Sequence, residues 1–304
     1  MSDATATRAG FVALIGAPNA GKSTLLNALV GAKVSIVSPK VQTTRFRVLG
    51  IALEGAAQIV FVDTPGLFEP RKRLDRAMVA AAWQGAADAD LVVLVVDAHR
   101  NRPGIDPDTA AILEKLGAAG RQAILALNKV DLVPPPVLLP MTERFLATGR
   151  VGDVFMVAAE SGDGVADLRR RVGELLPAGP HLFPADQLSD LPDRLLAAEI
   201  VREQLFRQLA QELPYAATVE TEAWTEREDG AVRIDATIFV ERDGQKAIVL
   251  GKGGARIKAI GAAARRELEA LFERRVHLFL HVKVRGGWQD DPERYRAIGL
   301  EFEP

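Results

Sequence analysis

Cysteine is absent from this sequence of 304 residues. Its absence excludes a disulfide framework and a zinc site built from thiolates, and it fits a reducing compartment. Long apolar runs are also missing, because the longest purely aliphatic run covers residues 91–96 and is far too short to span a bilayer. The first ten residues lack the apolar core and cleavage site of a secretory leader. We therefore expect a cytoplasmic protein without a membrane-spanning segment.

Apolar sequence is plentiful enough for two folded domains, since hydrophobic residues make up 48% of the chain. Short apolar segments between residues 11 and 176 alternate with helical patterns, and such uninterrupted runs are typical of strands buried on both faces. This alternation predicts an α/β domain with a mainly parallel sheet, helices on both faces, and ligands at the carboxyl ends of the strands. The expected strands are Phe11–Ile15, Ile59–Val62, Leu91–Val96, Ala123–Leu127 and Val154–Val157.

A glycine-rich segment, residues 16–23, follows the first expected strand. It has four free positions between two glycines and then Lys-Ser, the pattern of a P-loop whose backbone N–H groups surround phosphates at the start of a helix. We expect Lys22 to neutralise the β and γ phosphates, and Ser23 to bind Mg²⁺ directly. The expected nucleotide-binding residues here are Gly16, Ala17, Pro18, Asn19, Ala20, Gly21, Lys22, Ser23 and Thr24.

Two further segments complete the predicted nucleotide site. In Asp63–Gly66 we expect Asp63 to hold Mg²⁺ through water and Gly66 to offer its N–H to the γ-phosphate. In Asn128–Asp131, Asp131 accepts the two adjacent N–H donors of guanine, Asn128 bonds the other edge of the ring, and the stem of Lys129 covers the base. A site built for two donors rejects a ligand without them by about a hundredfold or more. The sequence thus predicts GTP or GDP with Mg²⁺.

These segments resemble the translation-factor-related class of GTPases. The resemblance implies that Thr43–Arg45 is the first switch, in which a threonine completes the magnesium shell only when a γ-phosphate is present, and we favour Thr44 over Thr43. The fifth segment of the class usually reads Ser-Ala-x-x-Gly, whereas residues 158–162 here begin with alanine. Base-binding residues are therefore expected to include Ala158, Ala159 and Glu160, with the N–H of Ala159 reaching the guanine oxygen.

Many signalling GTPases carry a glutamine after this glycine to orient the attacking water in GTP hydrolysis. Here Leu67 follows Gly66 instead. The reaction must then depend on phosphate electrostatics and backbone positioning, with a second cation as an open alternative. Two interpretations of Asn19 stay open: it binds potassium, as a similar asparagine does in related potassium-activated GTPases, or it only fixes the loop. The expected catalytic residues are Asn19, Lys22, Thr44, Asp63 and Gly66.

A second, smaller domain is expected after a turn-rich segment at residues 176–184. We expect a GTPase domain at 9–178, a linker at 179–192 and an α+β domain at 193–300. The pattern of that last domain predicts an amphipathic helix at 195–209 and strands at 215–224, 232–240 and 276–284. Between Arg242 and Arg285 there are 11 Lys or Arg against 4 Asp or Glu, a basic excess that indicates nucleic-acid contact.

The turn Gly251–Gly254 lies between two apolar-faced helical segments and resembles the Gly-x-x-Gly loop of KH domains. The resemblance implies that this loop clamps a nucleic-acid backbone while single-stranded bases lie in an apolar groove, for which we expect Ile248, Leu250, Ile257 and Ile260. The expected RNA-binding residues are Gly251, Lys252, Gly253, Gly254, Arg256, Ile257, Lys258, Ile260, Arg285 and Trp288.

Over residues 11–299 the chain resembles the Era family of KH-domain GTPases. The resemblance implies a GTP-hydrolysing switch that binds 16S ribosomal RNA near its 3′ end and assists maturation of the 30S subunit. We expect no stable oligomer. Its implied location is the cytoplasm, with peripheral association at the inner face of the membrane. Three alternatives stay open: a metabolic P-loop kinase, a tRNA-modifying GTPase, and an RNA-binding scaffold with a structural nucleotide site.

Overall fold

The computed structural model describes residues 7–40, 43–70, 73–209, 213–287, 292 and 300. The chain divides into two compact units. Unit 1 includes the chain up to Ser35 and Thr44–Asp190, and unit 2 includes Ile36–Thr43 and the chain from Leu191 to Tyr295. The sequence gives no signal that a short piece of the first half, residues 36–43, packs with the second half. Within the described ranges, no helix is both long and apolar enough to cross a bilayer.

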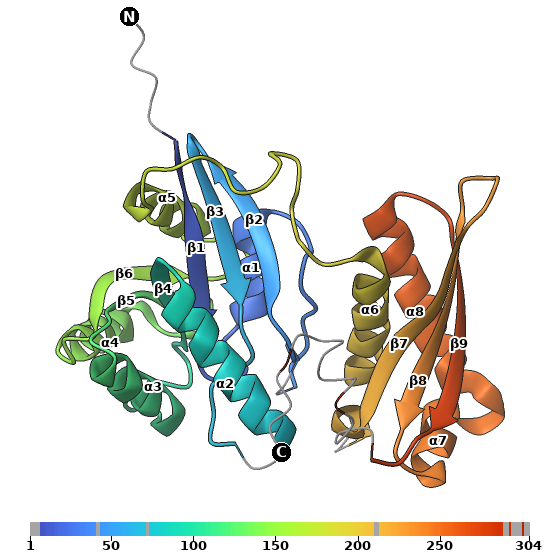
Figure 1. Ribbon diagram of the computed structural model, residues 1–304. Coiled ribbons are helices and arrows are strands. Elements are labelled where there is room, and N and C mark those ends of the chain that lie inside the picture. Colours follow the sequence, from blue (N-terminus) through green and yellow to red (C-terminus); the bar gives the residue numbers. More distant parts are fainter. Residues whose placement is uncertain are drawn as a thin grey trace, which may run out of the picture. The chain divides into compact units, whose positions relative to one another are not determined.

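A six-stranded sheet forms the centre of unit 1 (Figure 1). Its order is β2-β3-β1-β4-β5-β6, and every neighbouring pair is parallel except β2 with β3. The predicted mainly parallel sheet is therefore confirmed. The strands are β1 Arg8–Ile15, β2 Val48–Glu54, β3 Ala57–Asp63, β4 Leu91–Asp97, β5 Ala123–Asn128 and β6 Val151–Val157.

Strand β2 has no counterpart in the sequence analysis. Gly50 interrupts its apolar run, and glycine in a strand interior weakens the pattern on which a prediction depends. The glycine has a packing reason, because a Cβ at that position would lie 2.6 Å from Cδ1 of Leu26 and 2.7 Å from Cγ2 of Val30. Gly50 thus lets a neighbouring helix, α1 (Lys22–Val30), pack closely on this strand.

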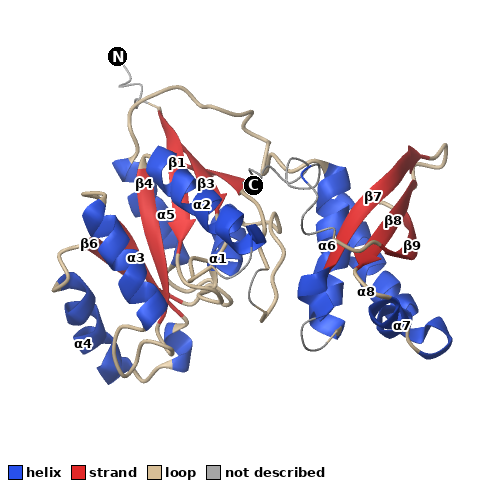
Figure 2. Cartoon of the chain, turned by 60° about the horizontal axis from the view of Figure 1, so that its bottom comes forward, coloured by secondary structure: helices blue, strands red, loops and turns tan. Residues whose placement is uncertain are grey.

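Helices cover both faces of this sheet (Figure 2). On one face, α1 packs with α5 (Val165–Leu175). The other face carries α2 (Arg73–Asp88), α3 (Pro107–Ala118) and α4 (Pro135–Leu146), whose apolar side chains join one core cluster with the strands. Because β1, β3, β4 and β5 are parallel, their carboxyl ends meet at one edge, and all three predicted nucleotide segments begin there.

The segment expected as a linker, 179–192, lies largely on unit 1. Gln58 is wholly buried, and its side-chain oxygen accepts from the N–H groups of Leu182 (2.6 Å) and Phe183 (2.9 Å). Farther along, the N–H of Ile51 donates to the carbonyl of Leu188 at 2.8 Å. A turn-rich composition predicts a connection but cannot reveal such partners, and the division between the units falls after Asp190.

Unit 2 is an α+β unit with a three-stranded sheet, as the sequence predicts. Strand β8 (Val232–Val240) is central, antiparallel to β7 (Ala217–Glu226) and parallel to β9 (Val276–Val284). Its core joins these strands to α6 (Asp193–Gln208) and α8 (Ala255–Phe272). The remaining elements are α7 (Asp243–Leu250) and two short 3-10 turns, η2 (Leu213–Ala216) and η3 (Lys252–Gly254).

Helix α6 differs from the expected amphipathic helix, because it is buried on nearly all sides. Arg202, Glu203 and Gln204 are 2%, 0% and 7% exposed, although they stand between apolar residues on what should be a solvated face. Residues 36–40 are part of the cover, because Ile36 belongs to the same core cluster as Ile200 of α6 and the N–H of Val37 donates to Glu203. Buried charges are tolerated when they are paired. Arg202 pairs with Glu199 at 2.5 Å, and Nε2 of Gln204 donates to Oε2 of Glu267 in α8 at 2.9 Å.

Candidate functional site

The segment 16–23 forms a loop between β1 and α1, and it encloses the ammonium group of Lys22. This side chain is 6% exposed, and its Nζ donates to the carbonyl oxygens of Gly16 and Ala17, each at 3.1 Å. Burial lowers the pKa of Lys22 to about 8, and the charge of Asp63 opposes that shift. A cation held inside a glycine-rich loop at a helix start is suited to a polyphosphate.

Gly21 is required by its backbone and by its neighbour. Its φ of 94° lies in the left-handed region, and a Cβ there would lie 2.3 Å from Nδ2 of Asn128. The same amide donates to the carbonyl of Ala20 at 2.9 Å, so the loop after β5 is tied to the phosphate loop. Asn19 also has a left-handed backbone, with φ of 62°, and its exposed side chain lies at the surface of the loop.

Three hydroxyl groups converge on Asp63, at the end of β3. Its Oδ2 accepts from Oγ of Ser23 (2.7 Å), Oγ1 of Thr44 (3.0 Å) and Oγ of Ser35 (3.0 Å). The hydroxyls of Ser23 and Thr44 are themselves 2.8 Å apart. Sequence reasoning did not single out Ser35, and no motif position marks it.

Asp63 is wholly buried, and burial raises the pKa of its carboxyl group while Lys22 and the hydroxyls oppose that shift. Its Oδ1 has no hydrogen-bond partner among the described residues. An orphan carboxylate oxygen beside two hydroxyls is a set of hard oxygen donors, which fits Mg²⁺. The described ranges hold no cluster of three or more acidic or histidine ligands, and Mg²⁺ commonly binds through few protein groups together with phosphates.

The two threonines of the expected first switch point to different partners. Oγ1 of Thr43 bonds Oγ of Ser38 at 2.9 Å and the carbonyl of Lys40 at 2.7 Å, within the segment 36–43. Thr44 instead lies beside Asp63. The structure therefore places Thr44, and not Thr43, with the magnesium-binding candidates.

Gly66 lies directly against the phosphate loop. A Cβ at Gly66 would be 3.1 Å from Cα of Pro18. The next residue, Leu67, donates its N–H to the carbonyl of Gly16 at 3.0 Å. The segment after β3 is thus held at the phosphate loop by backbone contacts, with no polar side chain at Leu67 to hold water.

The base-binding candidates meet after β5. Asn128 is 2% exposed, and its Oδ1 accepts from the N–H of Ala159 at 3.0 Å. That N–H was expected to reach the guanine oxygen, but here it holds Asn128 in place. Asp131, in the 3-10 turn η1 (Val130–Leu132), is exposed and has no hydrogen bond or ion pair with the described residues, so its carboxylate is available. Ala158, which precedes Ala159, is buried, whereas Glu160 is exposed.

Asp97 was missed by sequence reasoning. It ends β4, and its Oδ2 lies 2.6 Å from Nζ of Lys129. The same Nζ donates to the carbonyl of Asn19 at 2.7 Å. Lys129 therefore connects the β4 end, the phosphate loop and the base loop. The sequence signal that could have identified Asp97 was its position, at the carboxyl end of an apolar strand in a parallel sheet.

In unit 2, the loop Gly251–Gly254 connects α7 to α8. Gly251, Gly253 and Gly254 have φ of 70°, 59° and 77°, all in the left-handed region. A Cβ at Gly251 would lie 2.7 Å from Cβ of Arg256, whereas one at Gly253 would meet no atom within 4 Å. Gly253 therefore faces open space at the tip of the loop, where a phosphate backbone can approach.

Ile260 does not line an exposed groove, which corrects the prediction. It is 0% exposed and packs in the core of unit 2, because α8 directs this position toward the sheet. Ile248 is 49% exposed, and Leu250 and Ile257 are partly buried, so these three remain available as groove residues. The guanidinium of Arg256 donates to the carbonyl of Ile248 at 2.9 Å, which joins the two sides of the loop.

The basic excess of residues 242–285 is partly neutralised. Arg274 pairs with Glu226 at 2.6 Å, and Lys283 pairs with Glu222 at 2.7 Å. Lys252 and Lys258 are exposed beside the loop and form no ion pair with the described residues. Arg285 is exposed after β9, and its N–H donates to the carbonyl of Val240 at 2.8 Å. The predicted contact Trp288 lies outside the described residues.

Comparison with known proteins identifies both units. Residues 11–129 match the family model of the 50S ribosome-binding GTPase, and residues 212–289 match that of the KH domain. The chain is 60% identical to the protein named GTPase Era of Afipia carboxidovorans, over 97% of this chain and 95% of that protein. It is 59% identical to GTPase Era of Dinoroseobacter shibae, over 99% and 97% of the two chains.

Solved structures agree with this similarity over both units. A variant of Aquifex aeolicus Era bound to GDP and AlF4⁻ has a TM-score of 0.90 and 38% identity, covering 96% of this chain and 99% of that one. Era in complex with MgGDPNP and nucleotides 1506–1542 of 16S ribosomal RNA has the same score, identity and coverage. The likeness thus extends to structures that hold a guanine nucleotide and, in one case, RNA.

Proposed function

The chain belongs to the Era family of GTPases, and on that premise we propose that it is a GTP-controlled RNA-binding switch for the 3′ end region of 16S ribosomal RNA. The observation that carries the proposal is the 38% identical Era complex that holds MgGDPNP and nucleotides 1506–1542 of that RNA. The nucleotide site and the Gly-x-x-Gly loop described above supply the chemistry that each ligand needs. We further propose that the RNA is bound as part of the maturing 30S subunit, in the cytoplasm.

The geometry described above supports the nucleotide-binding roles. Lys22 would neutralise the β and γ phosphates, and the hydroxyls of Ser23 and Thr44 would bind Mg²⁺ with Asp63 behind them. Mg²⁺ neutralises charge that develops on the phosphates during hydrolysis. The backbone N–H of Gly66 would meet the γ-phosphate. These residues hold and orient the triphosphate, so the reaction depends on positioning and electrostatics rather than on a polar side chain at position 67.

Asp131 gives this site its base selectivity in our proposal. Its exposed carboxylate has no competing partner among the described residues and is free to accept the two donors of guanine. Asn128, tied to Ala20 and Ala159, fixes the depth of the base pocket relative to the phosphate loop. For Asn19, the left-handed backbone and the bond from Lys129 favour the loop-fixing role. Its potassium role stays a prediction of the sequence.

The segment 36–43 provides a route from the nucleotide to unit 2. It lies directly before Thr44 in the sequence and belongs to unit 2. Charged side chains of α6 bond to its backbone. The N–H of Val37 donates to Oε1 of Glu203 at 3.4 Å, and Arg202 donates to the carbonyl of Thr43. Glu203 in turn pairs with Arg207 at 2.6 Å. When Mg²⁺ and the γ-phosphate hold Thr44, they restrain this segment and thereby bias α6.

RNA recognition is assigned to the loop Gly251–Gly254 and its neighbours. Gly253 allows the RNA backbone to approach, Lys252 and Lys258 neutralise phosphates, and Ile248 with Ile257 contacts the bases. Phosphate contacts supply affinity that falls with salt, whereas base contacts supply the preference for one sequence.

Binding of the 3′ end fragment by Gly253→Asp and Gly253→Asn tests this assignment. Asn and Asp have nearly the same shape, and both tolerate a left-handed backbone, so they differ mainly by the charge placed against the RNA. We expect Gly253→Asp to weaken binding by about tenfold more than Gly253→Asn, because a carboxylate opposes phosphate at close range. Equal affinities for the two variants, or no preference of the wild type over an unrelated RNA of equal length, would contradict the proposal.

A further inference from the structure

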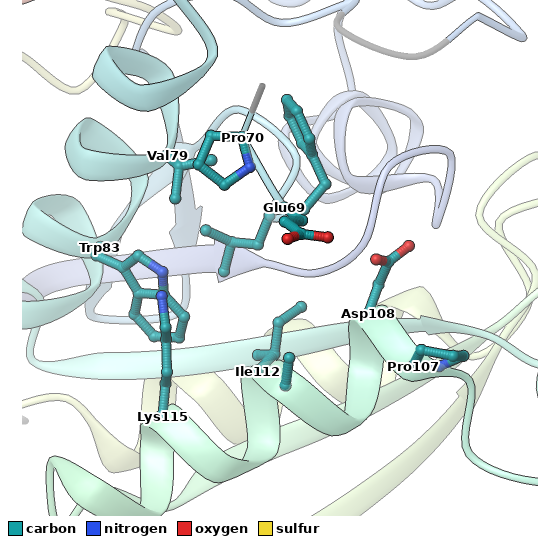
Figure 3. Close-up of a pocket in the computed structure, with 11 residues that line it drawn as sticks. Glu69, Pro70, Val79, Trp83, Pro107, Asp108, Ile112 and Lys115 are labelled. Atoms are coloured by element: carbon teal, nitrogen blue, oxygen red, sulfur yellow. The ribbon is translucent and has the colours of Figure 1, made fainter. Parts of the chain in front are cut away.

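A hollow of about 370 Å³ lies in unit 1, beside the second switch segment (Figure 3). The second switch segment is defined here as residues 67–70. It forms one wall, α2 forms another with Val79 and Trp83, and α3 forms the third with residues between Pro107 and Lys115. The volume is in the range of small ligand sites, which hold about 300–1,000 Å³.

The floor of this hollow is apolar. Leu67, Val79 and Ile112 line it and are only 3%, 8% and 2% exposed. Figure 3 shows the side chains of Val79 and Ile112. At one end, the half-buried ring of Trp83 has the ammonium of Lys115 at 5.3 Å from its centroid. A bulky apolar side chain placed here would bury its surface against the floor and the indole.

The opposite end of the hollow carries two carboxylates, those of Glu69 and Asp108, which lie near each other in Figure 3. Asp108 already pairs with Arg100 at 2.7 Å. Glu69 is exposed and has no hydrogen bond or ion pair with the described residues. One carboxylate at this end is therefore free to receive a cation. Because Arg100 neutralises Asp108, Glu69 supplies the unpaired negative charge at this end, while Lys115 lies at the other end of the hollow.

We propose that this hollow is a docking site for a basic segment of a protein partner. An apolar side chain of the segment would fill the space between Leu67, Trp83 and Ile112, and a neighbouring Arg or Lys would pair with Glu69. An apolar anchor in a pocket with a charged pair at its edge is a common form of interface centre. This surface belongs to unit 1, whereas the RNA-binding loop belongs to unit 2, and the proposal does not depend on the proposed RNA.

Docking at this site would be linked to the nucleotide. Leu67, which forms part of the floor, donates its N–H to Gly16 of the phosphate loop, and it follows Gly66 directly. A segment that restrains Leu67 therefore restrains the backbone beside the γ-phosphate position. Binding of the segment and binding of the nucleotide are then linked. If the segment changes the affinity for GTP relative to GDP by some factor, its own affinity differs between the GTP and GDP forms by the same factor.

A display library of random dodecapeptides, selected on the full chain with MgGDPNP, tests the proposal. Glu69→Lys serves in the counter-selection, and Glu114→Lys is the matched control, since Glu114 is exposed on α3 outside the hollow. We expect enriched peptides with a bulky apolar residue near Arg or Lys. A synthesised peptide should shift the indole N–H resonance of Trp83, identified with Trp83→Phe. Its affinity should fall by about fivefold in Glu69→Lys and stay unchanged in Glu114→Lys.

Four outcomes would overturn the proposal. They are the absence of enriched peptides, an unchanged Trp83 resonance on peptide binding, equal loss of affinity in Glu69→Lys and Glu114→Lys, and full affinity of a peptide whose arginines are replaced by citrulline. The last result would show that the hollow takes neutral apolar molecules instead. A shift of the Trp83 resonance by the 3′ end RNA, in the absence of peptide, would assign the surface to nucleic acid and also refute a protein partner.

Discussion

Replacing Gly21 with alanine should separate the phosphate loop from the base loop. The new Cβ would lie 2.3 Å from Nδ2 of Asn128, closer than any packed Cβ tolerates, so the Asn128 side chain must move. That movement would remove the 2.9 Å bond to Ala20 and disturb the 3.0 Å bond from Ala159. The left-handed backbone at Gly21, with φ of 94°, adds strain for any residue with a Cβ.

The magnitude follows from these parts. A left-handed backbone costs alanine about 1–2 kcal/mol, and each of the two hydrogen bonds contributes about 1 kcal/mol. Gly31→Ala is a matched control, because Gly31 also has a left-handed φ, of 80°, but a Cβ there would meet no atom within 4 Å. Both variants should lose stability through strain. Only Gly21→Ala should also bind GTP more weakly, by ~2 kcal/mol of binding free energy, which is about thirtyfold in affinity.

Titration calorimetry with MgGTP, beside thermal unfolding of each nucleotide-free variant, measures the two quantities. The reasoning requires that Gly31→Ala binds GTP like the wild type while Gly21→Ala binds about thirtyfold more weakly. If the two alanine variants bind GTP equally well, then the tie through Asn128 does not hold the site together, and the assigned role of Gly21 is wrong.

Two other predictions concern single side chains. Asp131→Asn should shift preference from guanosine toward xanthosine nucleotides, because an amide can donate to the O2 of xanthine. Unchanged selectivity in a nucleotide competition assay would show that Asp131 does not recognise the base. The pKa of Lys22 is lowered from 10.5 to about 8 in the folded protein. Between pH 8 and 10.5, Lys22 therefore carries its proton less often in the folded state than in the unfolded state. The free energy of unfolding of the nucleotide-free protein should therefore rise with pH from 8 to 10.5, by up to about 3 kcal/mol. Chemical unfolding should show no such rise in Lys22→Met, and equal slopes in both proteins would refute the assignment.

Much of the nucleotide site could be predicted because its residues are local to strand ends. In a parallel sheet the carboxyl ends lie at one edge, so Lys22, Asp63 and Asn128 had to come together once the strands were assigned. Thr44 could be favoured over Thr43 only through the resemblance to known GTPases. The structure places Thr44 at Asp63, through a bond that no periodicity encodes.

The features that sequence reasoning missed depend on partners distant in the chain. Asp97 has a role only because Lys129 reaches it, and Glu203 appears to belong on a solvated helix face until the segment 36–43 covers it. Ile260 was assigned to the groove through the resemblance of this segment to KH domains. Which face packs on the sheet is decided by tertiary contacts, and these bury Ile260.

The central claim is that the nucleotide controls RNA binding through the segment 36–43. It is tested most directly by the dissociation constant for the 3′ end fragment of 16S ribosomal RNA, measured with MgGDPNP, with MgGDP and without nucleotide. We predict an affinity at least about fivefold different between MgGDPNP and MgGDP, and a smaller ratio in Glu203→Gln, which weakens the hold of α6 on Val37. Equal RNA affinity in all three states of the wild type would contradict the account.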